Sequence, residues 1–472
     1  MRFLSALLFL TSAACAASVL PTDARFVMSH FKENGPDYGE RLYISYSADG
    51  TNWTTLNGGN PVWQPATYPN SNFRDPAIIY ASGYYWVAFT SGYPGSGYGN
   101  HLSFGLLKSS DLLNWTFVED VPTTIPNATD PLTWNPTFFR DGDGSIHVFV
   151  SISPINGATY YPIGGLKTYE LHPLNSDWTQ WSSPVLVQLP GNNSNEFWCW
   201  KEGGTYHALY VNFGAPGFPL THATSTSLLS GWGNARALNY NGEGSMMLIK
   251  PSGGYRLYFE PGNGSPDPGY RFSDVSGDFS TYTTPVKVAS TVIMRNGKMI
   301  ASAANTTYSD WTAQRLAGLS TANQAMTADP DCDGMPNLTE CYLDTNPQAA
   351  DAANGPIGSL TISGSDQFVT LRYRRRPQIS DVSASVQASG NLADWFSGAG
   401  QTEIQSAALM SDGTELVYAR DLNTTAANAS QFLRLQIVAD PIVIAGQQQI
   451  LQSTRIARRA SSRHRIRFLR TE

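Results

Sequence analysis

The sequence predicts an all-β protein, in which a five-bladed β-propeller is followed by a linker and a small β-sandwich-like domain. The first observation is composition: only 14% of the residues are charged, 12% are aromatic, and there are 42 glycines and 29 prolines. That mix is typical of strand-rich, turn-rich proteins. The second observation is a repeat of a strand, a polar turn and an anchoring aromatic residue, at Trp53, Trp115, Trp178, Trp232 and Tyr282.

The repeat sets the number of blades. Strand-like runs separated by turn signals precede the later copies, at residues 78–89, 146–153, 206–212 and 255–260. A period of about 50–60 residues, with roughly four short strands in each unit, is typical of a β-propeller. Five copies therefore predict five blades. The alternative is an all-β sandwich in which such turns recur by chance.

The N-terminus predicts secretion to the extracellular space or the periplasm. Residues 1–16 have the features of a signal peptide: a charged Arg2, an apolar run over residues 3–10, and an Ala14-Cys15-Ala16 cleavage site. No later segment has the 18 or more apolar residues of a membrane span. The net charge of −7 argues against nucleic acid as a partner. We expect a monomer that has no nucleic-acid partner and no membrane span.

Changes in composition divide the rest of the chain. The propeller is expected at residues 17–318, a linker at 319–350 and the β-sandwich-like domain at 351–438, where apolar and polar residues alternate. Residues 451–472 contain seven arginines and one glutamate. We therefore expect residues 439–472 to form a basic, disordered tail. Binding of this tail to an acidic glycan or surface is the alternative.

The linker contains a complete calcium-loop pattern, D-x-[DN]-x-[DN]-G-x5-E, over residues 329–340. Acidic and amide oxygens at alternate positions suit Ca²⁺, and Gly334 allows the sharp turn. The expected ligands are Asp329, Asp331, Asp333, the Met335 carbonyl, Asn337 and Glu340. Because no long helices flank it, the loop resembles those of bacterial thrombospondin-3 repeats or dockerins and predicts a structural ion. The alternative is a solvated acidic turn.

Three cysteines remain once the signal peptide is removed, so at most one internal disulfide can form. Cys332 and Cys341 bracket the calcium loop and are able to pair in a secreted protein, whereas Cys199 lies in the propeller. The sequence leaves open whether that disulfide forms.

Carboxyl groups at strand mouths are the candidate catalytic residues. A propeller places the innermost strand of each blade around one axis, so acids far apart in sequence converge there. Asp75 precedes an apolar strand, Glu243 stands between two glycines before another, and Glu196 precedes an aromatic strand. Two such carboxyls are what a glycosidase needs. For Asp75 taken alone, the alternative is an Asp that caps a turn.

These motifs resemble glycoside hydrolase family 43 over residues 24 to about 303. Arg74-Asp75-Pro76 matches the family motif that bears the general base, and Gly242-Glu243-Gly244 matches the motif of the general acid. Residues 197–207 resemble the strand after a third acid, which orients the general acid and raises its pKa. That acid is usually Asp, and Glu196 holds the position here.

Two departures from the family pattern stand beside these matches. Thr137 replaces an acid of the family, and the last blade, at residues 290–295, lacks a histidine that relatives often carry beside a central ion. We therefore predict no cofactor for catalysis and Ca²⁺ only as a structural ion.

The resemblance implies a secreted, inverting glycosidase with a carbohydrate substrate. Arg74 is expected to steady Asp75 or bind a sugar hydroxyl, and Phe73, Trp134 and Trp198 to stack on a sugar ring, the alternative for each aromatic being a place in the blade core. Plant-type α-L-arabinofuranosides are the first substrate class and β-xylosides the second. The alternatives are a carbohydrate-binding propeller that has lost activity and a fructosyl hydrolase of the invertase or levansucrase group.

Overall fold

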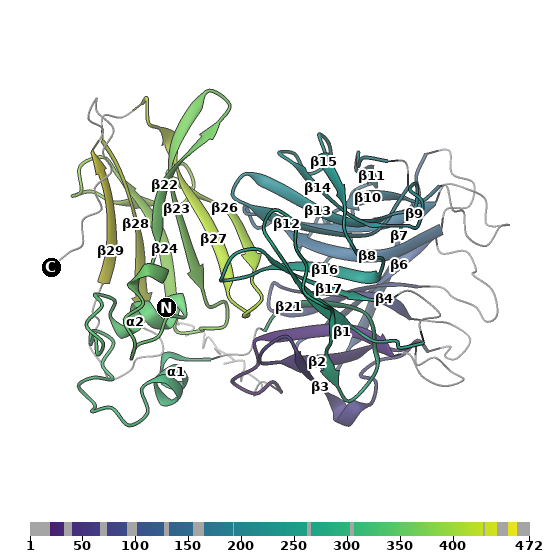
Figure 1. The fold of residues 1–472 in the computed structure, drawn as a ribbon, viewed down its shortest axis with the longest axis horizontal. Coiled ribbons are helices and arrows are strands. Elements are labelled where there is room, and N and C mark those ends of the chain that lie inside the picture. Colours follow the sequence, from purple (N-terminus) through teal and green to yellow (C-terminus); the bar gives the residue numbers. More distant parts are fainter. Residues whose placement is uncertain are drawn as a thin grey trace, which may run out of the picture.

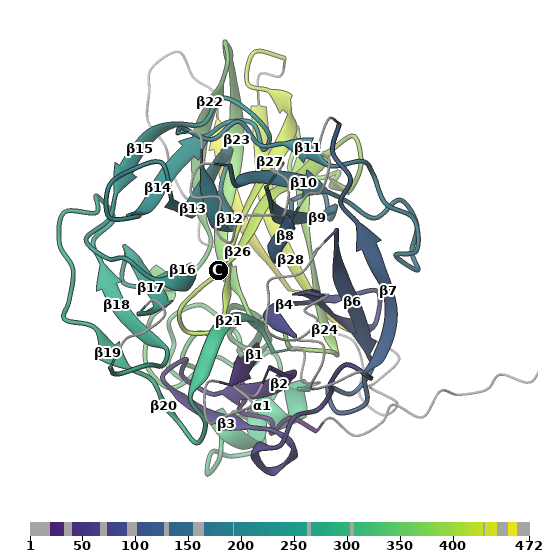
Figure 2. The same ribbon diagram turned by 90° about the vertical axis from the view of Figure 1, so that its right-hand side faces the viewer.

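Five small sheets surround a common axis in the N-terminal part of the chain (Figure 2). The computed structural model describes residues 19–32, 40–66, 73–91, 102–126, 132–153, 165–191, 193–261, 266–302, 306–427, 430–440 and 452–459. The predicted signal peptide lies outside these residues. No helix in the described part of the chain is long and apolar enough to cross a membrane.

Four blades are each built from four consecutive antiparallel strands. The first contains β4 (Arg74–Ala81), β5 (Tyr84–Thr90), β6 (Ser103–Ser109) and β7 (Thr116–Pro122). The second contains β8 (Leu132–Arg140), β9 (Ile146–Ser153), β10 (Lys167–Leu171) and β11 (Val185–Leu186). The third contains β12 (Ser194–Glu202), β13 (Thr205–Asn212), β14 (Leu220–Ser225) and β15 (Gly233–Ala237). The fourth contains β16 (Glu243–Ile249), β17 (Tyr255–Glu260), β18 (Arg271–Val275) and β19 (Val286–Lys287).

The fifth blade closes the ring by joining both ends of the propeller. Its strands are β1 (Phe26–Lys32), β2 (Tyr43–Ser47), β3 (Asn52–Thr55), β20 (Ala289–Ser290) and β21 (Met294–Ala301), and a 3₁₀ turn at Asn57–Gly59 follows β3. The innermost strand is β21, which pairs with β1. Neighbouring inner strands β4, β8, β12, β16 and β21 contact one another around the axis. The predicted five-bladed propeller is confirmed.

The recurring polar turn also has the predicted form. The indole N–H of Trp53 donates to the Gly50 carbonyl at 3.0 Å, and that of Trp115 donates to the Leu112 carbonyl at 2.8 Å. Asp49 accepts backbone N–H groups within its turn, as Asp111 does. Each aromatic residue thus seals a turn whose backbone donors are already satisfied by an aspartate.

The second unit is a two-sheet β-sandwich (Figure 1). One sheet contains β22 (Ile357–Ser363), β23 (Asp366–Arg375), β27 (Glu415–Thr424) and β26 (Thr402–Leu409). The other contains β25 (Phe396–Ser397), β24 (Val382–Ser389), β28 (Ser430–Ala439) and β29 (Gln452–Arg459). The helices α1 (Tyr308–Arg315) and α2 (Asn337–Leu343) contribute side chains to its core, and a 3₁₀ turn lies at Ala352–Asn354.

Two parts of the chain differ from the expected layout. The predicted linker is integrated into the sandwich, because Leu338, Cys341 and Leu343 of α2 pack with buried residues of both sheets. Residues 452–459, expected in a disordered tail, form strand β29 along β28. The edge of β28 offers unpaired backbone groups to a further strand, and backbone pairing does not need an apolar sequence. The Arg-rich composition alone therefore misplaces this segment.

The sandwich covers one end of the propeller (Figure 1). Ile249 and Met410 form a parallel bridge between the units, and the Gly203 N–H donates to Ser406 Oγ at 3.0 Å. A side chain at Gly142 would collide with the backbone carbonyl of Gln405. These contacts lie at or just after the C-terminal ends of the inner strands β8, β12 and β16. The N-terminal ends of those strands lie at the other end of the propeller, where we expect a site.

Candidate active site

Each inner strand of the propeller carries a β-bulge near its start. Strand register breaks there in all five blades. One residue at each bulge has a positive φ: Asp75 (50°), Asn135 (51°), Glu196 (58°), Gly244 (62°) and Asn296 (44°). A left-handed backbone costs roughly 1–2 kcal/mol for a residue with a Cβ. Bulges re-aim side chains, and strain of this kind concentrates at functional sites.

Asn296 connects the bulge residues of three other blades. Its Nδ2 donates to Asp75 Oδ1 at 2.7 Å, to Glu196 Oε1 at 3.1 Å and to Asn135 Oδ1 at 3.3 Å. Thr90 adds a second link, because its hydroxyl donates to Asp75 Oδ2 at 2.9 Å. The half-buried Asp75 is therefore held at both oxygens.

Gly244 allows the fourth blade to join this group. A Cβ at this position would lie 2.7 Å from Asn296 Cα, so a side chain does not fit. The Gly244 N–H donates to Glu196 Oε2 at 2.9 Å. Because Glu243 directly precedes Gly244, this hydrogen bond ties the start of β16 to Glu196 of the third blade.

A buried lysine lies among these carboxyl groups. Lys298 Nζ is 3.2 Å from Asn296 Oδ1 and 3.9 Å from Glu196 Oε2, and its side chain is 4% exposed. Burial raises the pKa of Glu196, the charge of Lys298 opposes that shift, and Asp75 reinforces it. Burial lowers the pKa of Lys298, while the neighbouring carboxylates oppose this shift. The ammonium therefore lies where a like-charged carboxyl pair would otherwise be uncompensated.

Glu243 has a different environment at the start of β16. Its side chain is 30% exposed, and Arg295 Nη2 contacts its Oε2 at 3.1 Å. Arg295 Nε also lies 2.8 Å from both oxygens of Glu260, which is fully buried. Burial, reinforced by Glu243, raises the pKa of Glu260 well above its usual range, and burial lowers that of Arg295 to about 10. One guanidinium thus serves two carboxyl groups.

Acidic side chains outnumber basic ones at the axis. Four carboxyl groups, those of Asp75, Glu196, Glu243 and Glu260, surround two cations, Arg295 and Lys298. With every group ionised, two negative charges would remain in a largely buried setting, which favours retention of protons. Such a group of carboxyls can supply one proton donor and one proton acceptor, which is the requirement of glycoside hydrolysis.

The predicted sugar-stacking residues separate into two classes. Trp134 is half-buried and directly precedes the bulge residue Asn135, and its role in sugar stacking stays a prediction. Phe73 is 0% exposed and packs against Trp63 and Phe89, with ring centroids 5.8 and 4.6 Å away. The prediction for Phe73 is therefore wrong, because a ring enclosed by two aromatic neighbours has no face for a sugar.

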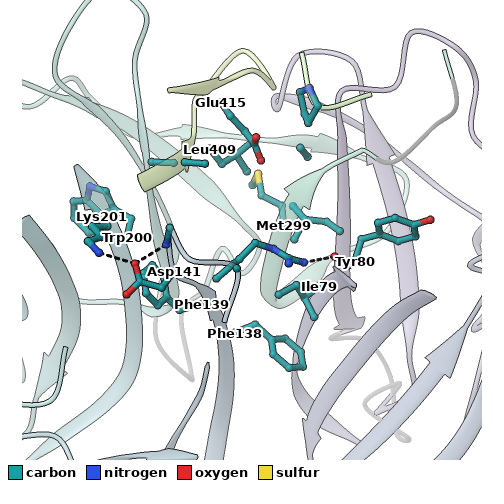
Figure 3. Close-up of a pocket in the computed structure, with 18 of the residues that line it drawn as sticks. Ile79, Tyr80, Phe138, Phe139, Asp141, Trp200, Lys201, Met299, Leu409 and Glu415 are labelled. Carbon is teal, nitrogen blue, oxygen red and sulfur yellow. Dashed lines mark hydrogen bonds and ion pairs between the residues drawn. The ribbon is translucent and has the colours of Figure 1, made fainter. Parts of the chain in front are cut away.

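Trp198 and Arg74 have contacts of different kinds. Trp198 packs against two core clusters and lines a cavity of about 600 Å³ between the propeller and the sandwich (Figure 3). It therefore belongs to the covered end of the propeller. Arg74 Nε is 3.8 Å from Glu40 and its guanidinium lies over the ring of Phe31 at 5.5 Å. These contacts place the Arg74 side chain against Glu40 and Phe31.

Sequence reasoning missed the partners of the acids, namely Asn135, Glu260, Arg295, Asn296 and Lys298. Arg295 ends the 290–295 segment and Asn135 lies two residues before Thr137, whereas the other three belong to no motif. A usable signal did exist, since Asn135 and Asn296 lie one blade period from the acids and hold the same bulge position as Asp75 and Glu196. Aligning the inner strands with one another would have revealed them.

The calcium-loop residues converge in the second unit. One carboxylate oxygen from each of Asp329, Asp331 and Asp333 lies within 4.8 Å of the others. Four buried oxygens have no hydrogen-bond partner: Asp331 Oδ2, Asn337 Oδ1, Glu340 Oε2 and Asp351 Oδ1. Burial and the surrounding aspartates raise the pKa of Glu340 to about 8. Cys332 and Cys341 are free thiols.

Asp351 was not among the expected ligands. Its backbone N–H donates to Asp333 Oδ2 at 2.9 Å, which places it against the loop. The orphaned oxygen of this residue, together with those of Asn337 and Glu340, is the arrangement that a hard cation satisfies. The donor set therefore fits Ca²⁺.

Comparison with known proteins supports the family resemblance. Residues 23–247 match a family profile described as "Probable glycosyl hydrolase domain", of the family 43-related type. This match covers slightly less than half of the chain and includes Asp75, Glu196 and Glu243. The segment is therefore similar to family 43-related glycosyl hydrolase domains, which supports glycoside hydrolysis as the activity. No curated protein matches significantly.

Several solved structures are similar to this chain at low identity. An endo-arabinase from Bacteroides thetaiotaomicron is 14% identical, with 53% of this chain and 89% of that chain covered and a TM-score of 0.42. An exo-β-1,3-galactanase from Clostridium thermocellum is 16% identical over 57% and 62%, with a TM-score of 0.43. An α-L-arabinofuranosidase from Clostridium thermocellum is 14% identical over 57% and 92%, with a TM-score of 0.41. At these scores the likenesses add nothing about substrate.

Proposed function

We propose that this chain is a secreted, inverting glycosidase that uses Asp75 as general base and Glu243 as general acid. The observation that carries the proposal is the convergence of acids from three blades at one end of the propeller axis. Asn296 donates to both Asp75 and Glu196, and the N–H of Gly244, the residue after Glu243, donates to Glu196. These residues match the base and acid motifs of the resembled family, in which the reaction proceeds with inversion.

The proposed reaction consumes one water molecule. Asp75 takes a proton from the water as its oxygen bonds to the anomeric carbon. The bond between that carbon and the leaving oxygen breaks at the same time, and Glu243 gives its proton to the leaving oxygen. Water attacks from the face opposite the departing group, so the configuration inverts. The half-exposed side chains of both residues are open to such a substrate.

Glu196 has a positioning role in this proposal. It is 3% exposed and accepts hydrogen bonds from Gly244 and Asn296, the two residues that place Glu243 and Asp75. Its negative charge, balanced by Lys298, sets the charge of the site without contact with the sugar. Glu in place of the family's usual Asp is accommodated because both of its oxygens have donors.

Plant-type arabinan and xylan side chains or oligosaccharides are the proposed substrates. The resemblance favours α-L-arabinofuranosides first and β-xylosides second. A carbohydrate-binding propeller that has lost activity and a fructosyl hydrolase are the alternatives. The retained Asp75 and Glu243 favour an active glycosidase.

The test is hydrolysis of aryl glycosides and of arabinan and xylan oligosaccharides by the wild type, with Asp75→Asn and Glu243→Gln as variants. Turnover of an arabinofuranoside or xyloside, abolished in both variants while circular dichroism is unchanged, is expected. Saturable sugar binding without turnover on any substrate would overturn the proposal and support the binding propeller. Turnover of sucrose or fructans alone would support the fructosyl hydrolase.

We also propose that Ca²⁺ binds the 329–340 loop as a structural ion. The proposed oxygen ligands are Asp329, Asp331, Asp333, the Met335 carbonyl, Asn337, Glu340 and, in addition, Asp351. Seven ligands lie within the usual range for Ca²⁺. The ion would neutralise the carboxylates at the start of α2, whose side chains pack into the sandwich core.

Calcium titration of the full chain by calorimetry tests this site. Asp351→Ala is expected to weaken Ca²⁺ binding while leaving it saturable. Asp366→Ala, at an exposed strand start in the same unit, serves as the control with unchanged affinity. Equal affinity in Asp351→Ala and wild type would remove Asp351 from the ligand set.

A further inference from the structure

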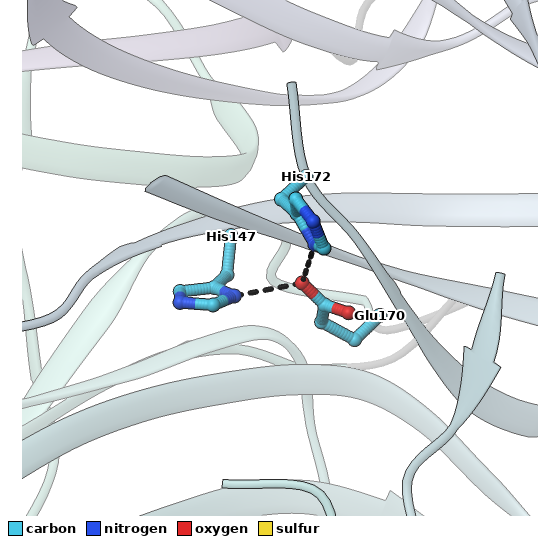
Figure 4. A group of neighbouring side chains, drawn as sticks. All are labelled: His147, Glu170 and His172. Carbon is cyan, nitrogen blue, oxygen red and sulfur yellow. Dashed lines mark hydrogen bonds and ion pairs between the residues drawn. The ribbon is translucent and has the colours of Figure 1, made fainter. Parts of the chain in front are cut away.

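A second histidine–carboxylate cluster lies in the second blade, outside the proposed active site (Figure 4). Strands β9 and β10 pair with Val148 opposite Leu171 and Phe149 opposite Glu170. Continuing that register places His147 opposite His172. Residues opposite one another share a face, and so do residues two apart on one strand, so all three polar side chains point the same way.

The three side chains meet at one atom. His147 Nδ1 is 2.7 Å and His172 Nδ1 is 3.0 Å from the same oxygen, Glu170 Oε1. Glu170 is 2% exposed, while the side chains of His147 and His172 are 18% and 42% exposed.

Hydrogen bonds fix the orientation of the His147 ring. The Ser145 hydroxyl donates to Asp143 Oδ1 at 2.7 Å, so its oxygen is an acceptor for His147 Nε2, which lies 3.0 Å away. His147 Nδ1 then faces Glu170 Oε1 at 2.7 Å and His172 Nδ1 faces the same oxygen, so three metal-ligating atoms point at one place.

We propose that His147, Glu170 and His172 bind a divalent transition-metal ion, with Zn²⁺ as the expected occupant. Two imidazole nitrogens and one carboxylate oxygen are a ligand set that Zn²⁺ favours, and a fourth, tetrahedral position is left for water. Ligand atoms around zinc stand slightly farther apart than the present 2.7 and 3.0 Å, so the ion enters by a small outward movement of the rings. The exposed His172 gives it a path from solvent.

The outer contacts are those that a metal ligand needs. The Asp143–Ser145 pair fixes the tautomer of His147, as outer-shell carboxylates do for zinc-bound histidines. The site joins two strands of one blade and contains none of the groups at the propeller axis. Its ion would therefore clamp the outer part of the second blade, independently of hydrolysis.

The test is Zn²⁺ titration of the tag-free full chain by calorimetry, with Ca²⁺ in excess so that the 329–340 loop is occupied. The wild type is expected to bind one equivalent, and Ser145→Ala to bind about 10-fold more weakly because an outer partner is lost. His172→Gln, at an exposed position, is expected to lose more affinity than Ser145→Ala. His207→Gln removes a histidine of the third blade and should leave binding unchanged.

A Co²⁺ absorption spectrum gives an independent readout. Tetrahedral Co²⁺ bands are expected in the wild type and His207→Gln and should be absent in His172→Gln. Equal Zn²⁺ affinity in His172→Gln and wild type would overturn the proposal. So would the lack of any saturable Zn²⁺ binding, which would assign the cluster to a metal-free imidazolium–carboxylate pair.

Discussion

The propeller axis and the 329–351 segment both gather carboxyl groups, yet they satisfy them differently. At the axis, Asp75, Glu196 and Glu260 have donors from Asn296, Lys298 or Arg295. In the 329–351 segment, oxygens of Asp331, Glu340 and Asp351 are buried without any partner, as is an Asn337 oxygen. The axis carries its own cations, whereas the loop, under the calcium proposal, takes an external one.

That difference separates chemistry from stability. Protonation at the axis is set by side chains that are always present, which suits proton transfer at a fixed pH. Under the calcium proposal, folding of the second unit is tied to the ion, because binding energy at such a loop is folding energy. Substitutions at the axis should therefore alter the rate of hydrolysis, and changes at the loop should alter the melting temperature.

The largest expected effect is at the axis and concerns Glu243. Glu243→Gln should lower kcat/KM by about 10²–10⁴-fold on substrates with a poor leaving group, since general acid help is lost. An aryl glycoside with a very acidic phenol needs no protonation and should lose much less. Asp75→Asn should lower kcat/KM on both kinds of substrate. Equal losses for Glu243→Gln on the two leaving groups would contradict its role as the acid.

The next largest effect is expected at Lys298, the buried cation beside Glu196. Lys298→Met keeps the length of the side chain and removes the charge, which leaves Glu196 buried without its partner. Unfolding free energy should fall by about 3–5 kcal/mol. Nearby carboxyls should hold protons more tightly, so the acidic limb of the kcat/KM profile should move to higher pH. Lys250→Met, which loses an ion pair with Asp274 at 2.9 Å, is the matched control and should cost less than about 1 kcal/mol.

Removal of calcium should act on the 329–351 segment and leave the propeller axis unchanged. A chelator is expected to lower the unfolding free energy by about 4 kcal/mol relative to free Ca²⁺ at about 1,000 times its Kd. Thermal melts with and without Ca²⁺ measure this, and kcat below the lowered melting temperature should be unchanged. A large loss of kcat in chelated but folded protein would join the two regions functionally and end the distinction.

The smallest expected effect is on how the free energy of unfolding depends on pH, through Glu260. The folded protein keeps a proton on Glu260 at pH values where the unfolded chain has lost it, because burial raises the pKa of Glu260 above 4.5. Its contribution to stability is complete below about pH 4.5 and declines as pH rises through the folded-state pKa, by about 1.4 kcal/mol per pH unit. Glu260→Gln cannot titrate, so urea unfolding across pH should show a shallower decline. An unchanged slope would show that Glu260 is ionised in both states.

How far the sequence predicts this molecule depends on the range of each interaction. The turn that ends in Trp53 or Trp115 is local, and its spacing predicts the blades. Asp75 and Glu243 are found because each stands in a short motif. Asn296 and Lys298 act on residues more than 90 positions away, so no local pattern marks them. Phe73 was misassigned because burial depends on Trp63 and Phe89, which come from other segments.

The central claim is that Asp75 and Glu243 act on opposite faces of one anomeric carbon. Proton NMR during the first minutes of hydrolysis of an arabinofuranoside or xyloside tests it most directly, because the first product anomer appears before mutarotation. The account predicts the anomer opposite to that of the substrate, and no early product with Asp75→Asn. Formation of the same anomer as the substrate would contradict it, since that outcome requires a carboxylate nucleophile in place of the water.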